Sequence, residues 1–301
     1  MNVLSLFDGM SCGQIALNRL GVNYNNYYAS EIDKYAIQIT QKNYPSTYQL
    51  GDILNWREWD LDWSSISLVT GGFPCQAWSI AGKQLGDRDE RGKLFWVMLD
   101  VISHVKKYNP EVKFLIENVK MKREFEEYIT HHTEEALGKV EKIQINSNLV
   151  SAHNRPRFYW TNINNLKQPK DLNINLGSIL EDKVDEKYYL SEKILNGSMV
   201  GKGSFNGRFK PLTKDSPKSY CLTARYFKMG KTDPYIQEVE GPINSVSSKI
   251  RRLTPIECER LQTVPDNYTE GVSNTQRYKM LGNGWTVDVI CHILGHEYGN
   301  N

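Results

Sequence analysis

Apolar and polar residues alternate along the first half of the chain in blocks with two different periods. Short apolar runs predict buried strands, and most are followed by a segment whose apolar positions recur at helical spacing. The predicted strands cover residues 2–7, 26–33, 66–74, 112–119 and 158–163, with one more ending before Asp52. The predicted helices cover residues 12–21, 34–45, 92–110 and 121–132. This alternation is typical of an α/β fold with a doubly wound, mostly parallel sheet.

The pattern changes after about residue 165. Short, weakly periodic pieces rich in Gly, Asn, Lys and Ser continue to about residue 250, so we expect a smaller, irregular second domain there. Helical spacing returns with Thr254, Pro255 and Glu257, which form the signature of a capped helix start. We therefore predict a first domain, a second domain and a segment that returns to the first, over residues 1–165, 166–250 and 251–301.

Composition narrows the class of protein. Of the 301 residues, 40% are hydrophobic and 24% are charged, as in a soluble globular protein. We find no apolar run long enough for a membrane span, and the N-terminus reads as a strand rather than a signal peptide. The five cysteines are scattered without a CxxC pair, which predicts neither a disulfide framework nor a metal site and favours the cytoplasm.

Charge is unevenly distributed along the chain. Residues 151–252 hold 18 Lys and Arg against 10 Asp and Glu, whereas the rest of the chain holds 19 against 25. The excess is densest over residues 200–231, with 8 basic residues and 1 acidic residue. Such a block indicates a polyanionic partner, although a solvated loop face would look the same.

The turn after the first strand, FDGMSCG, is a candidate ligand site because it leads from a strand into a helix N-terminus. It matches neither GxGxxG nor the phosphate-binding P-loop, so a nicotinamide oxidoreductase is disfavoured. Glu31 follows the second strand, where a carboxylate can accept two hydrogen bonds from ribose hydroxyls. Asp52 follows the third, where a carboxylate can accept from an adenine amino group. Together these features predict a cofactor that contains adenosine.

The stretch GGFPCQ places Cys75 after a predicted strand, behind a proline and two glycines. Pro74 restricts the backbone, and the glycines permit close approach of a ligand. A cysteine held at the edge of a cofactor site is suited to be a nucleophile, with the thiolate as the attacking form. A buried cysteine that packs as a small hydrophobe is the alternative.

The order of motifs resembles the DNA cytosine-5 methyltransferase family. The matching stretches are FDGMSCG, GGFPCQ, ENV at Glu117, RPR at Arg155 and Arg157, RRLTPIECERLQ and MLGNGW. They span nearly the whole chain except about residues 165–250. His153, where the family often has Gln, together with Trp285 and the FDGMSCG turn, is similar to the animal de novo methyltransferases within that family.

The resemblance implies S-adenosylmethionine as cofactor and a methyltransferase fold resembling the Rossmann fold. It implies a catalytic first domain, completed by residues 251–301, and a target-recognition domain at 166–250. The implied catalytic residues are Cys75, Glu117, Arg155 and Arg157. The implied cofactor contacts are Phe7, Asp8, Gly9, Cys12, Glu31, Ile32, Asp52, Ile53, Pro74, Asn283 and Trp285. The implied DNA contacts are Gln76, Ser79, Arg225 and Lys228.

The implied reaction is methyl transfer to carbon 5 of a cytosine flipped out of duplex DNA. Cys75 would add to carbon 6, Glu117 would carry a proton for ring nitrogen 3, and Arg157 would hold the carbonyl oxygen. Arg155 would orient the base or a phosphate. Residues 76–93, glycine-dotted and charged, would form a lid over the base.

Several alternatives stay open at this point. An RNA methyltransferase of the same fold is one, and an inactive DNA-binding relative is another, although all four implied catalytic residues are present. The resemblance implies a modification enzyme, either orphan, of phage origin or paired with a restriction endonuclease. Oligomeric state is not predicted, and a monomer would suffice.

Overall fold

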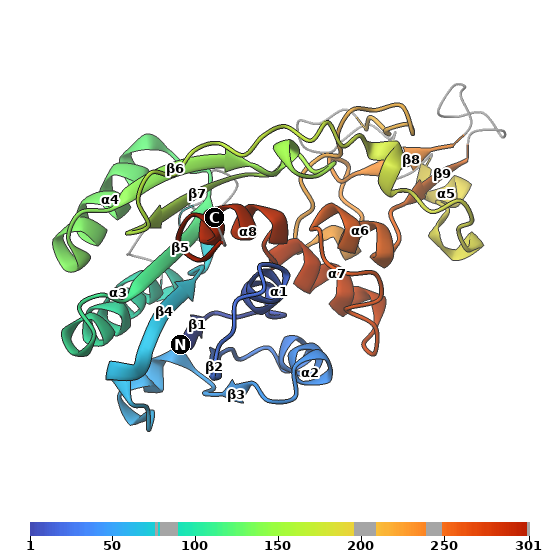
Figure 1. Ribbon diagram of the computed structural model, residues 1–301. Helices are drawn as coiled ribbons and strands as arrows, with labels where there is room; N and C mark the ends of the chain where they lie inside the picture. The colour runs from blue at the N-terminus through green and yellow to red at the C-terminus, as the bar shows by residue number, and fades with distance from the viewer. Residues whose placement is uncertain (76–77, 79–89, 196–208, 239–248, 300–301) are drawn as a thin grey trace. The chain divides into compact units, whose positions relative to one another are not determined.

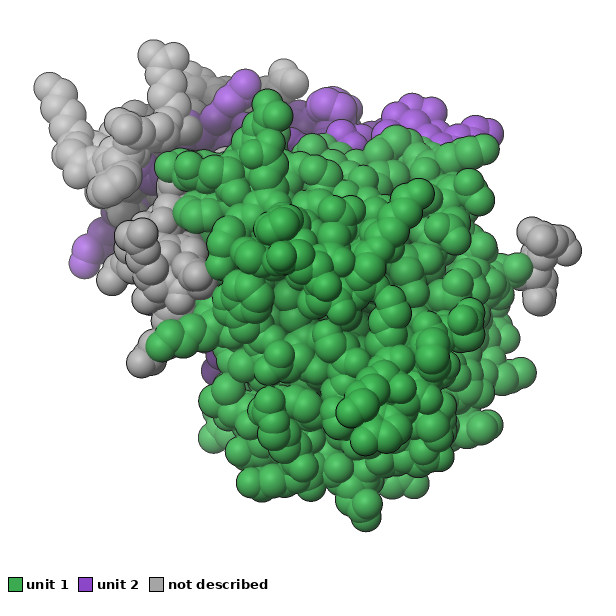
Figure 2. Space-filling model, turned by 90° about the vertical axis from the view of Figure 1, so that its left-hand side faces the viewer, with its two compact units in different colours: residues 1–146, 156–169, 289–301 green, residues 147–155, 170–288 purple. Residues whose placement is uncertain are grey.

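The computed structural model describes residues 1–75, 78, 90–195, 209–238 and 249–299. The chain forms two compact units, coloured separately in Figure 2. The first consists of Met1–Asn146, Pro156–Pro169 and Val289–Asn301, and the second of Ser147–Arg155 and Lys170–Asp288. The second unit thus includes most of the segment 251–301, which the domain prediction assigned to the first domain.

A seven-stranded sheet forms the first unit, in the order β3-β2-β1-β4-β5-β7-β6. The five strands from β3 to β5 are parallel, and β7 is antiparallel to both of its neighbours. The strands are β1 (Asn2–Leu6), β2 (Asn26–Ser30), β3 (Tyr48–Gln49), β4 (Ile66–Gly71), β5 (Lys113–Val119), β6 (Glu141–Asn146) and β7 (Pro156–Thr161). This topology confirms the predicted fold class.

Helices cover both faces of the sheet. In Figure 1, α3 and α4 lie on one side of it, and α1, α2 and α8 lie on the other. Their bounds are α1 (Cys12–Arg19), α2 (Lys34–Asn43), α3 (Glu90–Tyr108), α4 (Arg123–Leu137) and α8 (Val287–Tyr298). Short 3-10 helices, η1 (Ile53–Glu58) and η2 (Trp63–Ser65), precede β4.

The central strands are apolar because both of their faces are covered. Residues 3–6 of β1 are all buried, as are residues 68–71 of β4. Leu6, Val69 and Ile116 from three adjacent strands share one hydrophobic cluster with Phe95 and Met98 of α3. Burial of this apolar area, at about 25 cal/mol per Å², is the main stabilising contribution to the unit.

The second unit is irregular, as predicted, with a two-stranded antiparallel sheet. Its elements include η5 (Ser147–Leu149), η6 (Leu176–Ile179), η7 (Glu186–Tyr188), α5 (Glu192–Ile194), η9 (Tyr226–Lys228), β8 (Tyr235–Gln237), β9 (Ile250–Arg252), α6 (Pro255–Leu261) and α7 (Asn274–Asn283). The predicted capping box of α6 is present, with the Thr254 side chain accepting from the Glu257 N–H. Both Glu257 oxygens also accept from the buried Arg251 guanidinium, at 2.8 and 2.9 Å.

Two details differ from the predicted elements. The edge strand β6 was not predicted from the sequence, and β3 is only two residues long, so that Asp52 lies beyond it as the N-cap of η1. Among the residues that the structure describes, no helix is both long enough and apolar enough to cross a membrane.

Candidate active site

The turn between β1 and α1 has an unusual backbone. Phe7, Gly9 and Ser11 all have positive φ, at 55°, 60° and 64°. For Phe7 and Ser11 this conformation is strained, and such strain concentrates at functional sites. An ideal Cβ on Gly9 would have no atom within 4 Å, so open space adjoins the backbone there. The turn can therefore admit a ligand close to its main chain.

Glu31 holds this turn in place. Its Oε2 accepts a hydrogen bond from the Gly9 N–H at 2.7 Å, and its Oε1 accepts from the N–H groups of Ile32 and Asp33 at 2.7 and 2.8 Å. A carboxylate has about four acceptor positions, so these three bonds leave room for one more donor. The Ile32 side chain is 73% exposed next to this carboxylate in sequence.

Asp8 is the buried acid of the same turn. Its Oδ1 accepts from the Tyr27 hydroxyl at 3.0 Å. Burial raises the pKa of Asp8 from 3.8 to about 6, and hydrogen bonds from Ser5, Ser11 and Tyr27 oppose that rise. Asp8 therefore titrates near neutral pH.

The other predicted cofactor residues of the first unit have mixed environments. Asp52 caps η1, where its Oδ1 accepts from the Leu54 N–H at 3.0 Å. Cys12 and Ile53 are buried, whereas Phe7 and Pro74 are half-buried. Asp52 and Ile53 follow β3, and Phe7 follows β1, so these residues lie beyond the carboxyl ends of the two parallel strands that flank β2.

Cys75 lies beyond the carboxyl end of β4. Its carbonyl oxygen accepts from the Trp78 N–H at 3.0 Å, and its side chain is half-buried. Phe73, two residues earlier, is buried against Phe95 at a ring-centroid distance of 5.1 Å. The turn that carries the thiol is thus packed from one side by α3.

Glu117 reaches the same edge of the sheet, from β5. Gly71, the last residue of β4, pairs with Ile116 in the register of β4 and β5. Glu117 follows Ile116 on β5 and is therefore level with the residue that comes directly after β4. The Arg157 Nε lies 3.0 Å from Glu117 Oε1, and both side chains are nearly buried. An ion pair with little water around it is ordered and strongly oriented.

Asn118 braces the cysteine turn. Its side chain is buried, its Nδ2 donates to the Phe73 carbonyl at 3.1 Å, and its Oδ1 accepts from the Val119 N–H at 2.8 Å. The first unit therefore brings together three of the four predicted catalytic residues, Cys75, Glu117 and Arg157.

Arg155 lies in the second unit and has different surroundings. It is 3% exposed, and its guanidinium donates to the backbone carbonyls of Leu222, Gly282 and Gly284 at 2.8, 3.0 and 2.9 Å. His153 is fully buried, and its Nε2 accepts from the Leu222 N–H at 2.8 Å. These contacts are to backbone groups that anchor loops.

The remaining predicted contacts also belong to the second unit or lie outside the described residues. Asn283, at the end of α7, is exposed, and Trp285 is half-buried. Arg225 and Lys228 are both exposed, on and beside η9. Gln76, Ser79 and most of the predicted lid, residues 76–77 and 79–89, lie outside the residues that the structure describes.

Trp78 is a residue that the sequence reasoning missed. Its ring is 1% exposed and contacts Phe73, Phe95 and Phe125 at centroid distances of 6.1, 5.9 and 5.6 Å. The only signal for it is a lone aromatic residue in a polar, glycine-dotted stretch, which has no periodicity to indicate burial.

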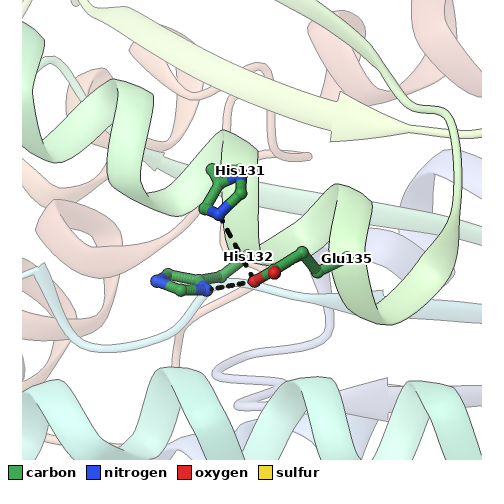
Figure 3. Close-up of side chains that lie close together, drawn as sticks. All are labelled: His131, His132 and Glu135. Atoms are coloured by element: carbon green, nitrogen blue, oxygen red, sulfur yellow. Dashed lines mark hydrogen bonds and ion pairs between the residues drawn. The ribbon is translucent and has the colours of Figure 1, made fainter.

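A second cluster of polar side chains lies on α4 (Figure 3), far along the chain from the cysteine turn. His132 Nδ1 and His131 Nε2 lie 2.7 and 3.5 Å from the same oxygen of Glu135. The potential ligand atoms of the three residues lie within 4.8 Å of one another. Because both imidazoles pair with one carboxylate oxygen on one helical turn, the arrangement matches the side-chain pairs that stabilise helix surfaces.

The chain is similar in sequence to known DNA methylases and in structure to a known methyltransferase. A family model described as C-5 cytosine-specific DNA methylase matches residues 1–297. The type II methyltransferase M1.ScrFI of Lactococcus lactis subsp. cremoris is 32% identical, over 97% of this chain and 76% of its own length. The type II methyltransferase M.NlaX of Neisseria lactamica is 30% identical, over 97% and 94%. The solved structure of the Entamoeba histolytica methyltransferase EhMeth has the same fold, with a TM-score of 0.76 and 19% identity, over 98% of this chain and 97% of that one.

Proposed function

Since the chain belongs to the C-5 cytosine-specific DNA methylase family and is a DNA cytosine-5 methyltransferase, we propose that it works through a covalent bond between Cys75 and carbon 6 of a flipped cytosine. The observation that carries this proposal is the position of Cys75. It lies on a braced turn at the end of β4, at the same sheet edge as the Glu117–Arg157 pair.

Carbon 5 of cytosine is a poor nucleophile. Bond formation between the Cys75 sulfur and carbon 6 moves electron density through the ring towards carbon 5 and ring nitrogen 3. The thiolate is the reactive form, so the Cys75 proton must leave before the addition. After methylation, loss of the carbon 5 proton lets the carbon–sulfur bond break, and the thiolate is restored.

Glu117 and Arg157 would stabilise the ring during the addition. Glu117 would first take up a proton, and the resulting carboxyl group is suited to hydrogen-bond ring nitrogen 3, where negative charge develops, and to give it that proton. Arg157, which is held against Glu117 by the contact from its Nε and donates from Nη1 to the Pro156 carbonyl at 2.9 Å, would turn its guanidinium towards the cytosine carbonyl oxygen. Fixed partners of this kind require little reorganisation as charge develops.

S-adenosylmethionine would supply an electrophilic methyl group when bound, as the family implies. The turn after β1 fits such a molecule, because Gly9 borders open space and Glu31 keeps one acceptor position. Glu31 would accept from a ribose hydroxyl, and Asp52 from the adenine amino group. Phe7, Asp8, Gly9, Cys12, Ile32, Ile53, Pro74, Asn283 and Trp285 would complete the cofactor contacts.

Duplex DNA would be read by the segment 166–250, which holds 14 Lys and Arg against 10 Asp and Glu. Arg225 and Lys228 are exposed there, which suits phosphate or guanine contacts, and Gln76 and Ser79 would meet the DNA around the flipped base. The type II names of the relatives support a modification enzyme that acts with a cognate restriction endonuclease. We place that activity in the cytoplasm, and a monomer suffices for it.

The proposal is tested by incubating the protein with radiolabelled S-adenosylmethionine and either duplex DNA or transfer RNA, with Cys75→Ser alongside. We expect label on carbon 5 of DNA cytosine, lost in Cys75→Ser while DNA and cofactor binding persist. A fully active Cys75→Ser would refute the covalent mechanism. Label in transfer RNA alone would show an RNA substrate instead of DNA.

A further inference from the structure

In the second unit, the segments 152–155 and 219–222 run side by side. Both backbone polar groups of Leu222 form hydrogen bonds with side chains of the segment 152–155. The Leu222 N–H donates to His153 Nε2, and the Leu222 carbonyl accepts from Arg155 Nη1, each at 2.8 Å. Asn154 and Ser219 add two backbone bonds, from the Asn154 N–H to the Ser219 carbonyl and from the Ser219 N–H to the Ala152 carbonyl. The segment 219–222 is therefore fastened along its length to residues 152–155.

Arg155 also forms hydrogen bonds to the turn at the end of α7. Its Nη2 donates to the carbonyls of Gly282 and Gly284, at the end of α7. The backbone of Gly282 lies so close to Thr223 and Ala224 that an added Cβ would stand 2.2 Å from the Thr223 carbonyl carbon. One buried guanidinium thus joins the segment that leads into Arg225 to the turn that carries Asn283 and Trp285.

We propose that His153 and Arg155 are positioning residues that hold the Leu222–Arg225 segment and the Gly282–Trp285 turn in one arrangement. The proposal rests on the proposed function, in which Arg225 contacts DNA and Asn283 and Trp285 contact the cofactor. This role replaces the predicted one, in which Arg155 orients the base or a phosphate. A guanidinium can serve three carbonyls at once because its N–H groups form a planar fork, and lysine cannot reproduce that fork.

A positioning role for Arg155 and a direct contact of Arg155 with the substrate predict different binding results. A residue that touches only the target base or a phosphate does not affect cofactor binding in the absence of DNA, whereas a residue that fixes the Gly282–Trp285 turn does. We would measure the Kd of S-adenosylhomocysteine without DNA, the Kd of duplex DNA without cofactor, and kcat, for Arg155→Met and Arg155→Lys in the full chain. We expect Arg155→Met to weaken both affinities by about tenfold, because it leaves buried carbonyls unpaired. Arg155→Lys should recover only part of each loss.

His153 has its own matched pair of variants. His153→Gln keeps an acceptor for the Leu222 N–H and should retain wild-type DNA affinity, whereas His153→Leu removes it and should lose about tenfold. Rescue by the isofunctional side chain would not be expected if His153 only filled space. Gly282→Ala, which keeps Arg155 but forces the Thr223 backbone away, should reproduce the paired losses of Arg155→Met.

Wild-type affinity for S-adenosylhomocysteine in Arg155→Met, together with a fall in kcat, would overturn the proposal in favour of direct substrate contact. Equal behaviour of His153→Gln and His153→Leu would overturn the part played by His153. Melting curves identify variants that fail to fold, and Arg155→Lys is the milder test in that case. Trp285→Ala distinguishes a failure of the proposed function from a failure of the positioning role. If Trp285→Ala binds S-adenosylhomocysteine normally, the cofactor assignment of the turn is wrong. The DNA affinities of the Arg155 variants then decide the positioning role.

Discussion

Asn118 offers a direct measure of how far catalysis depends on the rigidity of the cysteine turn. Replacement by Ala removes two hydrogen bonds of a buried amide, one to the Phe73 carbonyl and one from the Val119 N–H. Each buried group left unpaired costs about 1–3 kcal/mol. We therefore expect Asn118→Ala to lower the free energy of unfolding by about 2–6 kcal/mol. Urea denaturation would measure this loss.

The effect on turnover should exceed the effect on folding. The Phe73 carbonyl lies two residues before Cys75, so loss of its partner lets the thiol move relative to carbon 6. A displacement of about 1 Å at a reacting atom can cost on the order of 100-fold in rate. Single-turnover methylation at saturating DNA and cofactor would report that step.

A matched control separates rigidity from general destabilisation. Thr133 is fully buried on α4, and its hydroxyl donates to the Ile129 carbonyl at 2.6 Å, a bond that involves no residue of the cysteine turn. Thr133→Ala should lose stability but keep the wild-type rate of methylation. Wild-type turnover in Asn118→Ala, at a stability loss equal to that of Thr133→Ala, would refute the bracing role.

Three other predictions follow from the described contacts. Burial raises the pKa of Asp8 to about 6, so its contribution to stability is complete below the unfolded pKa near 4 and is lost as pH rises through 6. This contribution is worth about 3 kcal/mol. Asp8→Asn should therefore abolish that part of the pH dependence of urea unfolding, and an unchanged profile would contradict the assignment. Arg251→Met leaves the buried Glu257 charge unpaired and should cost about 3–5 kcal/mol of unfolding free energy, whereas a loss below about 1 kcal/mol would show that the pair is dispensable. Joint replacement of Arg225 and Lys228 by Gln should weaken DNA binding and lower its salt slope by about two, and an unchanged slope would exclude phosphate contacts.

The sheet could be predicted because its central strands are buried on both faces. β1 and β4 are short, mostly apolar runs, and the intervening helices keep their own period, so the two patterns are easy to distinguish. β6 could not be recognised in the same way. Its sequence, EKIQIN, alternates charged or polar and apolar residues, and only Ile145 in it is buried, as befits an edge strand.

The positions of some site residues could likewise be predicted from the sequence, and those of others could not. Cys75 follows the apolar strand β4, and Glu117 lies near the end of the parallel strand β5, so the parallel topology brings both to one edge of the sheet. The strand predicted over residues 158–163 includes neither Arg155 nor Arg157. β7 begins at Pro156, however, so Arg157 lies on the strand and Arg155 lies before it, in the other unit. Such a short spacing cannot reveal where a strand begins, and burial of Arg155 depends on carbonyls 67 or more positions away in the chain.

The hydrogen bonds of Glu31 set a limit on how the enzyme can discriminate between nucleosides. Both acceptor positions of Oε1 and one of Oε2 are occupied by the protein's own N–H groups. The Glu31 carboxylate can therefore accept a hydrogen bond from one hydroxyl of a sugar, and it does not respond to the presence of the other hydroxyl. Of two cofactor analogues, one lacking the 2′ oxygen and one lacking the 3′ oxygen, only one would be penalised at this position, and the protein's own turn would keep its shape with either.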